Sequence, residues 1–189
     1  MNRIGTAGPI EVVGADMPLR EGHLALRCNF ATIDDNDDRI ITRPAGRSDY
    51  GLDEITRYIN ENVDIGVPFT FQRTYGHRAV LIIRTNLSDE ITDNDPYRDG
   101  EKIKRVTGMT RDAILSAKLV HDFIDKSHDV IKIHPKNGER KGKKLLPANY
   151  IIVREAGNKV QAYPRFLKTW KIKKAACIAE LGVTRGICM

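Results

Sequence analysis

Apolar and polar residues alternate in the first part of the chain in the manner of strands. In residues 23–33, HLALRCNFATI, the apolar side chains recur at every second position: Leu24, Leu26, Cys28 and Phe30. This period of two is typical of a half-buried strand, and it puts Arg27 and Asn29 on the opposite face. The turn-rich run IDDNDDR follows, and two isoleucines at 40–41 resume the apolar pattern. The pattern therefore predicts a strand followed by a hairpin.

Within that turn, Asp34, Asn36 and Asp38 have the spacing of the first ligands in a calcium-binding loop. Such a loop also has Gly at its sixth position and Glu at its twelfth, and this sequence lacks both. A hairpin turn rich in aspartate and asparagine is therefore the better interpretation.

Helical and strand patterns follow one another through the middle of the chain. A helix is predicted at 52–59, where the apolar residues have helical spacing: Leu52, Ile55, Tyr58 and Ile59. Ser48 or Asp49 is available as its N-terminal cap. Residues 67–73 alternate, and AVLII at 79–83 is a continuous apolar run typical of a strand covered on both faces. These two segments are predicted to be neighbouring strands.

A long amphipathic helix is predicted after the polar segment 86–101, with Thr110 as its cap. The residues that share its helical spacing are Ile114, Leu115, Lys118, Leu119, His121, Phe123 and Ile124. The basic stretch 136–144, KNGERKGKK, lies between two prolines and contains two glycines, so a mobile, solvated loop is expected there. A strand is predicted at 150–153. The apolar segment that begins at Ala175 ends in GICM without a helix stop, so the natural fold is expected to continue.

This alternation of strands and helices predicts an α/β or mixed α+β domain with a mixed sheet. The length of 189 residues allows one large domain, or one domain and part of another. No apolar run approaches the ~20 residues needed to cross a bilayer, and the first residues lack the order of a secretory signal, so a cytoplasmic protein without a membrane partner is expected. Cys28, Cys177 and Cys188 lack the spacing of a zinc site and are expected to be reduced.

The charge of the chain favours an anionic partner. The net charge of +6 and the pI near 9.3 fit either a nucleic acid or a small phosphorylated metabolite. A nucleic-acid-binding module is the less favoured alternative, because aromatic residues make up only 6% of the chain and no stacking platform or RNA-binding motif is visible. No histidine has metal-ligand spacing, so no metal site is predicted in this chain.

Four blocks of sequence, taken together, resemble the archaeal-type 2,3-bisphosphoglycerate-independent phosphoglycerate mutases of the alkaline phosphatase superfamily. The blocks are AGPIEVVG with ALRCNFATID; RPAGR; GHRAVLIIR with LSDEITDNDP; and LPANYIIVREAG with KKAACIAELGVTRGI. They span nearly the whole chain in the order of the family and correspond to the middle of the family's proteins. The resemblance implies an isomerase of glycolysis and gluconeogenesis that interconverts 3-phosphoglycerate and 2-phosphoglycerate.

In that family the phosphoryl group passes through a serine, with the help of two divalent metal ions, Mn or Mg. The serine and the metal ligands lie near the two ends of the full protein, so the resemblance implies that this chain holds neither and is inactive by itself. Residues 1–147 would form a substrate-binding insertion, or cap, and residues 148–189 would begin the returning phosphatase-like core. A phosphatase acting on another sugar phosphate belongs to the same superfamily and stays open as an alternative.

Arginines are the first candidates for binding such a substrate. A phosphoglycerate carries roughly three negative charges, and guanidinium groups match the geometry of phosphate and carboxylate. Arg27 in RCNFAT and Arg43 and Arg47 in RPAGR are the strongest candidates, because the glycine of RPAGR lets the backbone approach a ligand. Arg78 in GHR and Arg154 in IIVREAG are weaker candidates, because arginines at strand ends commonly pair with neighbouring carboxylates.

Two positions of the last block bear on the substrate. The family usually has Arg-Gly-Ala-Gly where this chain has REAG, so Glu155 replaces a glycine and a close approach of the backbone to a ligand is less favoured there. The resemblance also implies that Lys174, or its neighbour Lys173, contacts the substrate. The ammonium group would stabilise charge on the transferring phosphoryl group.

Three carboxylates in LSDEITDNDP complete the candidate site: Asp89, Asp93 and Asp95. They would orient the glycerate hydroxyls or hold arginines in place, because a carboxylate accepts two parallel bonds from a guanidinium. An ordinary turn segment explains the same residues equally well.

Overall fold

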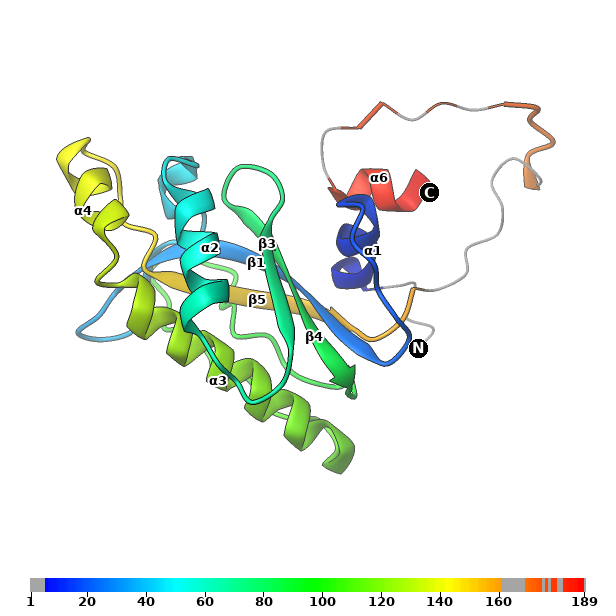
Figure 1. The fold of residues 1–189 in the computed structure, drawn as a ribbon, viewed down its shortest axis with the longest axis horizontal. Coiled ribbons are helices and arrows are strands. Elements are labelled where there is room, and N and C mark those ends of the chain that lie inside the picture. The colour runs from blue at the N-terminus through cyan, green and yellow to red at the C-terminus, as the bar shows by residue number, and fades with distance from the viewer. Residues whose placement is uncertain (1–5, 161–168, 175, 177, 180–181, 189) are drawn as a thin grey trace.

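The computed structural model describes residues 6–160, 169–174, 176, 178–179 and 182–188. Five strands form one sheet: β1 (His23–Asp34), β2 (Arg39–Thr42), β3 (Phe69–Arg73), β4 (Arg78–Asn86) and β5 (Tyr150–Gly157). The helices are α1 (Ala7–Gly14), α2 (Leu52–Asn62), α3 (Ile114–Ile131), α4 (Pro135–Gly142) and α6 (Gly182–Cys188), with 3-10 turns η1 (Ala45–Arg47) and η2 (Arg111–Ala113). The predicted α/β class is confirmed (Figure 1).

β1 is the centre of the sheet because it pairs with three other strands. β1 pairs with β4 through residues 23–29, with β5 through residues 25–31 and with β2 through residues 32–34, and β3 pairs with β4. All of these pairs are antiparallel, so the mixed sheet expected from the sequence is not observed among the described strands. The strand expected at 23–33, the hairpin after it and the neighbouring strands expected at 67–73 and 79–83 are thus confirmed.

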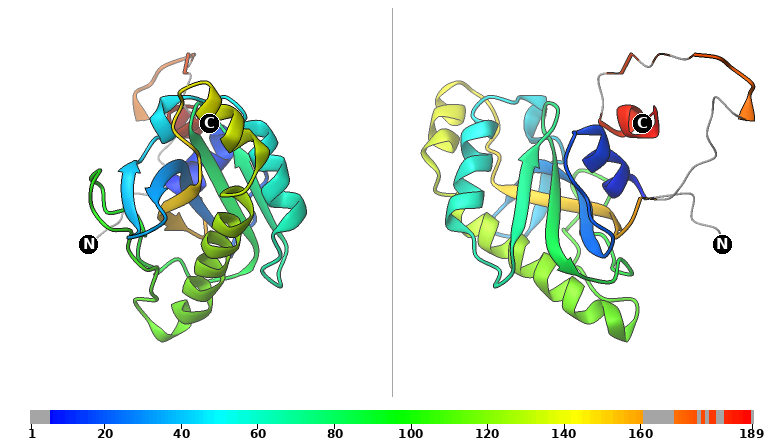
Figure 2. Two further views of the ribbon diagram at one scale, coloured as in Figure 1. Left: turned by 90° about the vertical axis from the view of Figure 1, so that its left-hand side faces the viewer. Right: turned by 45° about the vertical axis from the view of Figure 1, so that its right-hand side comes forward.

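Helices α2 and α3 cover one face of the sheet (Figure 1, Figure 2). The alternating apolar residues of β1 point into this layer and are each at most 1% exposed: Leu24, Leu26, Cys28 and Phe30. Phe30 packs edge to face against Phe71 of β3, with ring centroids 5.6 Å apart, and Phe71 lies 5.4 Å from Phe123 of α3. The period of two in the sequence therefore builds the main hydrophobic core.

The opposite face of the sheet is covered over only part of its length. There α1 packs Val12 against Val80 and Ile82 of β4, and α6 lies beside α1 (Figure 1). The same face carries the polar residues of β1 that alternate with the core: Arg27 lies beneath α1, and Asn29 lies beyond it. This part of the sheet is where a ligand can reach the strands.

The caps expected for α2 and α3 were wrong. α2 begins after Gly51, whose left-handed backbone (φ 74°) turns the chain into the helix, and neither Ser48 nor Asp49 caps it with a side chain. α3 begins after the turn η2, and the hydroxyl of Thr110 donates to Glu90 at 3.1 Å instead of capping the helix. The local sequence could not show these alternatives, because a glycine turn and a partner twenty residues away take the place of the cap.

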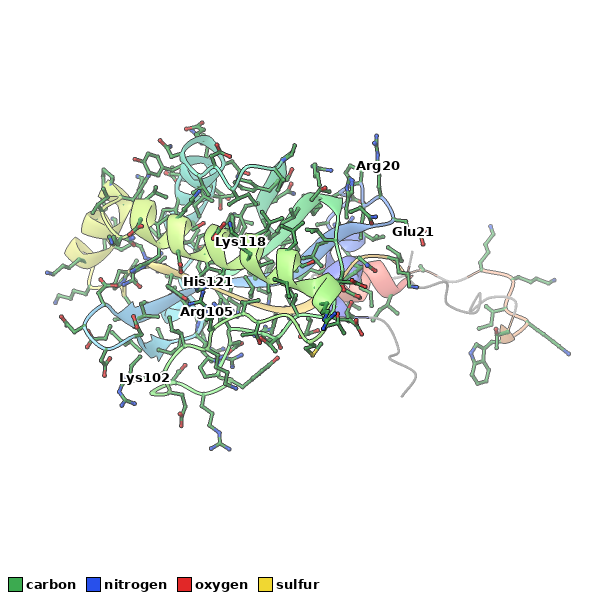
Figure 3. The ribbon with its side chains drawn as sticks, turned by 90° about the horizontal axis from the view of Figure 1, so that it is seen from below. Arg20, Glu21, Lys102, Arg105, Lys118 and His121 are labelled. Atoms are coloured by element: carbon green, nitrogen blue, oxygen red, sulfur yellow. The ribbon has the colours of Figure 1, made fainter. Side chains whose placement is uncertain are left out.

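The buried stripe of α3 also differs from the expected one. Ile114 and Leu115 are 62% and 55% exposed, so their assignment to the apolar face was wrong. The stripe consists instead of Ala117, Leu119, Val120, Phe123, Ile124 and Ile131. Lys118 and His121, labelled in Figure 3, each lie near a carboxylate four residues further along the helix. The first turn of α3 thus extends past the edge of the core.

The basic stretch at 136–144 is not the solvated loop expected from its composition. Most of it forms α4, and Arg140 is completely buried. The guanidinium of Arg140 donates hydrogen bonds to the carbonyl oxygens of Ala45, Tyr50 and Leu146 at 2.8, 2.6 and 2.8 Å. The expectation failed because these acceptors come mainly from a loop some ninety residues away in sequence.

The division of the chain at residue 147 stays a prediction. β5, which falls in the second part, is hydrogen-bonded to β1 in the sheet. Of the apolar segment that begins at Ala175, residues 175, 177, 180 and 181 lie outside the described residues, the described residues 176 and 178–179 form no strand, and residues 182–188 form α6. The thiol of Cys177 and the side chain of Cys188 also lie outside the description, whereas Cys28 is free and buried. Among the helices that the structure describes, none has the length and apolar character to cross a membrane.

Candidate functional site

The uncovered part of the sheet forms one side of a basic cleft of about 690 Å³. The residues that line this basic cleft are Asn29, Thr42, Arg43, Pro44, Gly46, Arg47, His77, Arg78, Tyr97, Asp99 and Arg154. They come from β1, the end of β2 and the loop after it, the start of β4 and the turn before it, the segment after Asp95, and β5. Four of the five candidate arginines therefore converge on one cleft: Arg43, Arg47, Arg78 and Arg154.

Strand register explains why residues so distant in sequence meet here. Asn29 of β1 pairs with Arg78 of β4, and Arg27 of β1 pairs with Arg154 of β5. Paired residues of antiparallel strands point to the same face of the sheet. The polar positions of three strands are therefore placed side by side on the face that α2 and α3 leave free.

Asp95 holds two of the arginines in position. Its carboxylate accepts two bonds from Arg43, at 2.8 and 2.5 Å, and one from Arg154, at 2.7 Å. Asp95 is fully buried, and burial alone would raise its pKa, but hydrogen bonds from Arg43, the Tyr97 amide and Arg154 outweigh burial and lower the pKa. Asp95 thus holds two arginines, and its Oδ1 also accepts the backbone N–H of Tyr97 at 2.8 Å, as in the turn that was the alternative interpretation.

Arg27 is not brought into the basic cleft. Its Nε lies 2.9 Å from Oε2 of Glu11, and its Nη1 lies 3.5 Å from Oε1 of Glu155. Glu11 is 1% exposed, and burial raises its pKa although Arg27 opposes this effect. Arg27 therefore sits beneath α1, next to Arg154 but tied to carboxylates, so the expected convergence of Arg27 with Arg43 and Arg47 is not observed.

The remaining candidates lie apart from the arginines of the basic cleft. Asp93 accepts the backbone N–H of Glu155 at 2.9 Å and the hydroxyl of Tyr97. Asp89 and Asp93 line a second, smaller cavity of about 290 Å³. Lys174 is exposed and lines neither cavity.

Glu155 occupies a bulge in β5. Ala25 pairs with Gly157 and Arg27 pairs with Arg154, so β5 has one residue more than β1 between these pairs. Glu155 has a φ of 55°, in the left-handed region that favours glycine. The position at which the family resemblance implied a glycine is therefore one whose backbone suits a glycine.

The loop that carries Arg43 and Arg47 is conformationally strained. Ala45, Gly46 and Arg47 have consecutive φ values of 42°, 69° and 61°, and left-handed backbone is costly for the two residues that are not glycine. The buried guanidinium of Arg140 donates a hydrogen bond to the carbonyl oxygen of Ala45 at 2.8 Å. Arg140 thus acts as the anchor that keeps this loop in its conformation.

Several residues of the site were missed by sequence reasoning, among them Asn29 and His77 in the lining of the cleft and Arg140 in its support. Asn29 is 5% exposed and lies in RCNFAT, but its position on the polar face was not used to select it. His77 precedes Arg78 in GHR, and burial together with the nearby arginines lowers its pKa to about 4. The sequence does not distinguish Arg140 as a buried residue, because it lies in a basic run that is typical of a solvated surface.

The described residues do not fit a metal ion. No group of three or more His, Cys, Asp or Glu side chains that could bind one is found among them. In the basic cleft, the carboxylate of Asp95 is engaged by guanidiniums, whose positive charge opposes a divalent cation. The arrangement suits an anion with several acceptor oxygens, which guanidinium groups bind in a defined orientation.

Comparison with known proteins agrees with this chemistry. The family of 2,3-bisphosphoglycerate-independent phosphoglycerate mutases matches residues 5–137. A Methanopyrus kandleri protein with that name is 40% identical over 164 residues, which are 83% of this chain and 39% of that protein. Its Methanosphaera stadtmanae counterpart is 39% identical over 185 residues, which are 95% of this chain and 44% of that protein.

A solved structure gives the same result. The cofactor-independent phosphoglycerate mutase from Thermoplasma acidophilum has a TM-score of 0.76 and 32% identity, covering 97% of this chain and 49% of that one. The chain spans less than half the length of the curated relatives described above. The archaeal-type resemblance read from the four sequence blocks is thereby confirmed, and the chain belongs to the 2,3-bisphosphoglycerate-independent phosphoglycerate mutase family.

Proposed function

We propose that the basic cleft binds phosphoglycerate, and that this chain is the substrate-binding part of an enzyme that interconverts 3-phosphoglycerate and 2-phosphoglycerate. The observation that carries the proposal is the convergence of Arg43, Arg47, Arg78 and Arg154 on one cleft. A small acid with roughly three negative charges at its two ends needs several guanidiniums arranged in this way.

The arginines of the basic cleft are of two kinds. Arg43 and Arg154 are fixed by the shared carboxylate of Asp95 and keep some of their N–H groups for a ligand. Arg47 and Arg78 form no ion pair with a carboxylate among the described residues, and burial lowers the pKa of Arg78. A bound dianionic phosphate or a carboxylate would offset the charge of this second pair.

The chemistry of the reaction is assigned to other residues. The family resemblance puts the serine nucleophile and the Mn or Mg ligands in segments that correspond to neither the cleft nor its walls. We therefore expect the chain alone to convert no 3-phosphoglycerate in the presence of manganese or magnesium. Turnover by the isolated chain would contradict this assignment of the nucleophile.

Calorimetric titration of the 189-residue chain with 3-phosphoglycerate tests the binding role. Replacing both Arg47 and Arg78 by Gln should weaken binding at least tenfold, because a hydrogen bond to a charged group contributes about 1.5–3 kcal/mol. Arg57→Gln is the matched control, since Arg57 is exposed on α2, across the sheet from the basic cleft. Equal affinity of all three proteins would show that the ligand binds elsewhere or not at all.

Two alternatives are decided in the same experiment. A sugar phosphate without a carboxylate should compete weakly, because only one end of it is charged, and strong competition would favour a phosphatase of another sugar phosphate. Single-stranded RNA should show no steeply salt-dependent binding, which is the signature of a nucleic-acid-binding surface.

A further inference from the structure

Neutral polar side chains line the basic cleft together with its arginines: Asn29, Thr42, His77 and Tyr97. Asn29 lines the cleft from β1 and is 5% exposed, and its Oδ1 has no hydrogen-bond partner in the described part of the chain. Buried polar atoms almost always have a partner, because an unsatisfied one costs free energy. An amide left in this state on the wall of a binding cleft is a group that a ligand can satisfy.

His77 is another of these neutral side chains. Its backbone carbonyl accepts the N–H of Phe30 at 2.9 Å, which fixes the turn before β4 against β1, and its side chain lines the basic cleft. Burial and the positive charges of Arg78 and Arg47 favour the uncharged imidazole. A neutral imidazole has one N–H donor and one nitrogen acceptor.

Asn29 and His77 supply hydrogen-bond acceptors, which the arginines lack. A guanidinium only donates hydrogen bonds, whereas phosphate and carboxylate only accept them. A hydroxyl group both donates and accepts, so its hydrogen needs an acceptor in the cleft. Asp99 also lines the cleft, but its Oδ1 accepts the backbone N–H of Arg43 at 2.9 Å in an exposed position. Asn29 Oδ1 and the acceptor nitrogen of His77 are therefore two neutral acceptors of the cleft, beside the hydroxyl oxygens of Thr42 and Tyr97, and Asn29 Oδ1 is buried without a partner among the described residues.

We propose that Asn29 and His77 recognise the free hydroxyl of the bound acid, so that the basic cleft selects a phosphorylated hydroxy acid over an equally charged acid without the hydroxyl. The proposal rests on the proposed function, since it assumes that the cleft binds such an acid. In this assignment the arginines hold the two charged ends, and the neutral pair distinguishes ligands by the group between them.

The test compares two ligands of equal charge by calorimetry on the full chain: 3-phosphoglycerate and 3-phosphonooxypropionate, which lacks the hydroxyl. The wild-type chain should prefer 3-phosphoglycerate about tenfold or more, because a site built to bond a hydroxyl leaves buried groups unpaired without it. Asn29→Val and His77→Phe should each bring the ratio of the two affinities towards one. Arg47→Gln is the control: it should weaken the binding of both ligands and leave the ratio of their affinities unchanged.

A stability measurement separates recognition from a structural role. Asn29→Val removes an amide whose Oδ1 has no partner among the described residues and introduces a residue that favours strands, so the melting temperature should stay the same or rise by roughly a few degrees. A fall in melting temperature would show that Asn29 is structural and would overturn the proposal for this residue. His77→Gln, which keeps a neutral hydrogen-bonding side chain, should preserve more of the preference than His77→Phe.

The outcomes are distinguishable from those of the proposed function. If the wild-type chain binds both ligands equally well, the basic cleft binds anions but the recognition of the hydroxyl is refuted. If the chain binds neither ligand, the proposed function fails and this inference fails with it.

Discussion

The two faces of the sheet use the same strands for opposite purposes. On β1, Leu26 and Phe30 point under α2 and α3 and are completely shielded, whereas Arg27 and Asn29 alternate with them and point to the opposite face. The covered face is an apolar core, and its contacts stabilise the fold. The opposite face gathers positive charge and an amide oxygen, Asn29 Oδ1, that has no hydrogen-bond partner among the described residues, and both are unfavourable without a ligand. Residues that stabilise the core and residues that face the cleft side therefore alternate along the same strand.

The largest expected effect comes from the covered face. Phe30→Ala removes a fully buried ring that packs against Phe71, and should lower the free energy of unfolding by about 3–5 kcal/mol. Arg78→Gln, on the opposite face of the neighbouring strand, should change it by less than about 1 kcal/mol. Urea unfolding followed by circular dichroism measures both. If both variants lost a similar free energy of unfolding, the claim that only the covered face stabilises the fold would be contradicted.

Arg140 should show the second largest effect, because it links the core side of the molecule to the strained loop of the basic cleft. Arg140→Met leaves the carbonyls of Ala45, Tyr50 and Leu146 without their donor, and should cost about 2–3 kcal/mol. It should also weaken binding of 3-phosphoglycerate, since the loop presents Arg43 and Arg47. Lys141→Met, on the exposed side of the same helix, is the matched control and should be nearly neutral in both assays.

A pH dependence follows from His77. Its pKa is lowered to about 4 in the folded chain, below the ordinary value of 6.5, so the unfolded chain binds a proton more readily. The stability that this histidine contributes is fully present above pH 6.5 and is lost as the pH falls towards 4. Between pH 7 and pH 5 the wild-type chain should lose about 1–2 kcal/mol more than His77→Gln, allowing for partial solvent screening. Parallel pH profiles would show that His77 is not held neutral.

The smallest expected effect concerns Glu155. Glu155→Gly relieves a left-handed backbone and should raise the free energy of unfolding by about 1 kcal/mol, and it also removes a negative charge near Arg27 and Arg154. Glu155→Gln removes the charge but keeps the strained residue. We therefore expect both variants to bind 3-phosphoglycerate more tightly, and only the glycine variant to be more stable. A glycine variant that is less stable would mean that the ion pairs outweigh the strain.

Local patterns explain why much of the fold was predictable. The alternation in β1 and the apolar run of β4 are read directly from neighbouring residues, and the resulting strands pair as expected. The arginines of RPAGR and GHR were found because motifs mark them. The sequence could not show that Arg27 forms an ion pair with Glu11, because this contact depends on how α1 packs on β1. It could not show that Arg140 is buried either, because its acceptors lie in a distant loop.

The most direct test of the central claim is an NMR titration of the arginine Nε–Hε signals with 3-phosphoglycerate. The signals of Arg43, Arg47, Arg78 and Arg154 should shift together and saturate at one ligand per chain, and those of Arg57 and Arg111 should stay in place. Shifts that are absent, that do not saturate, or that are largest in the basic helix α4 would contradict the assignment of the basic cleft as the phosphoglycerate site.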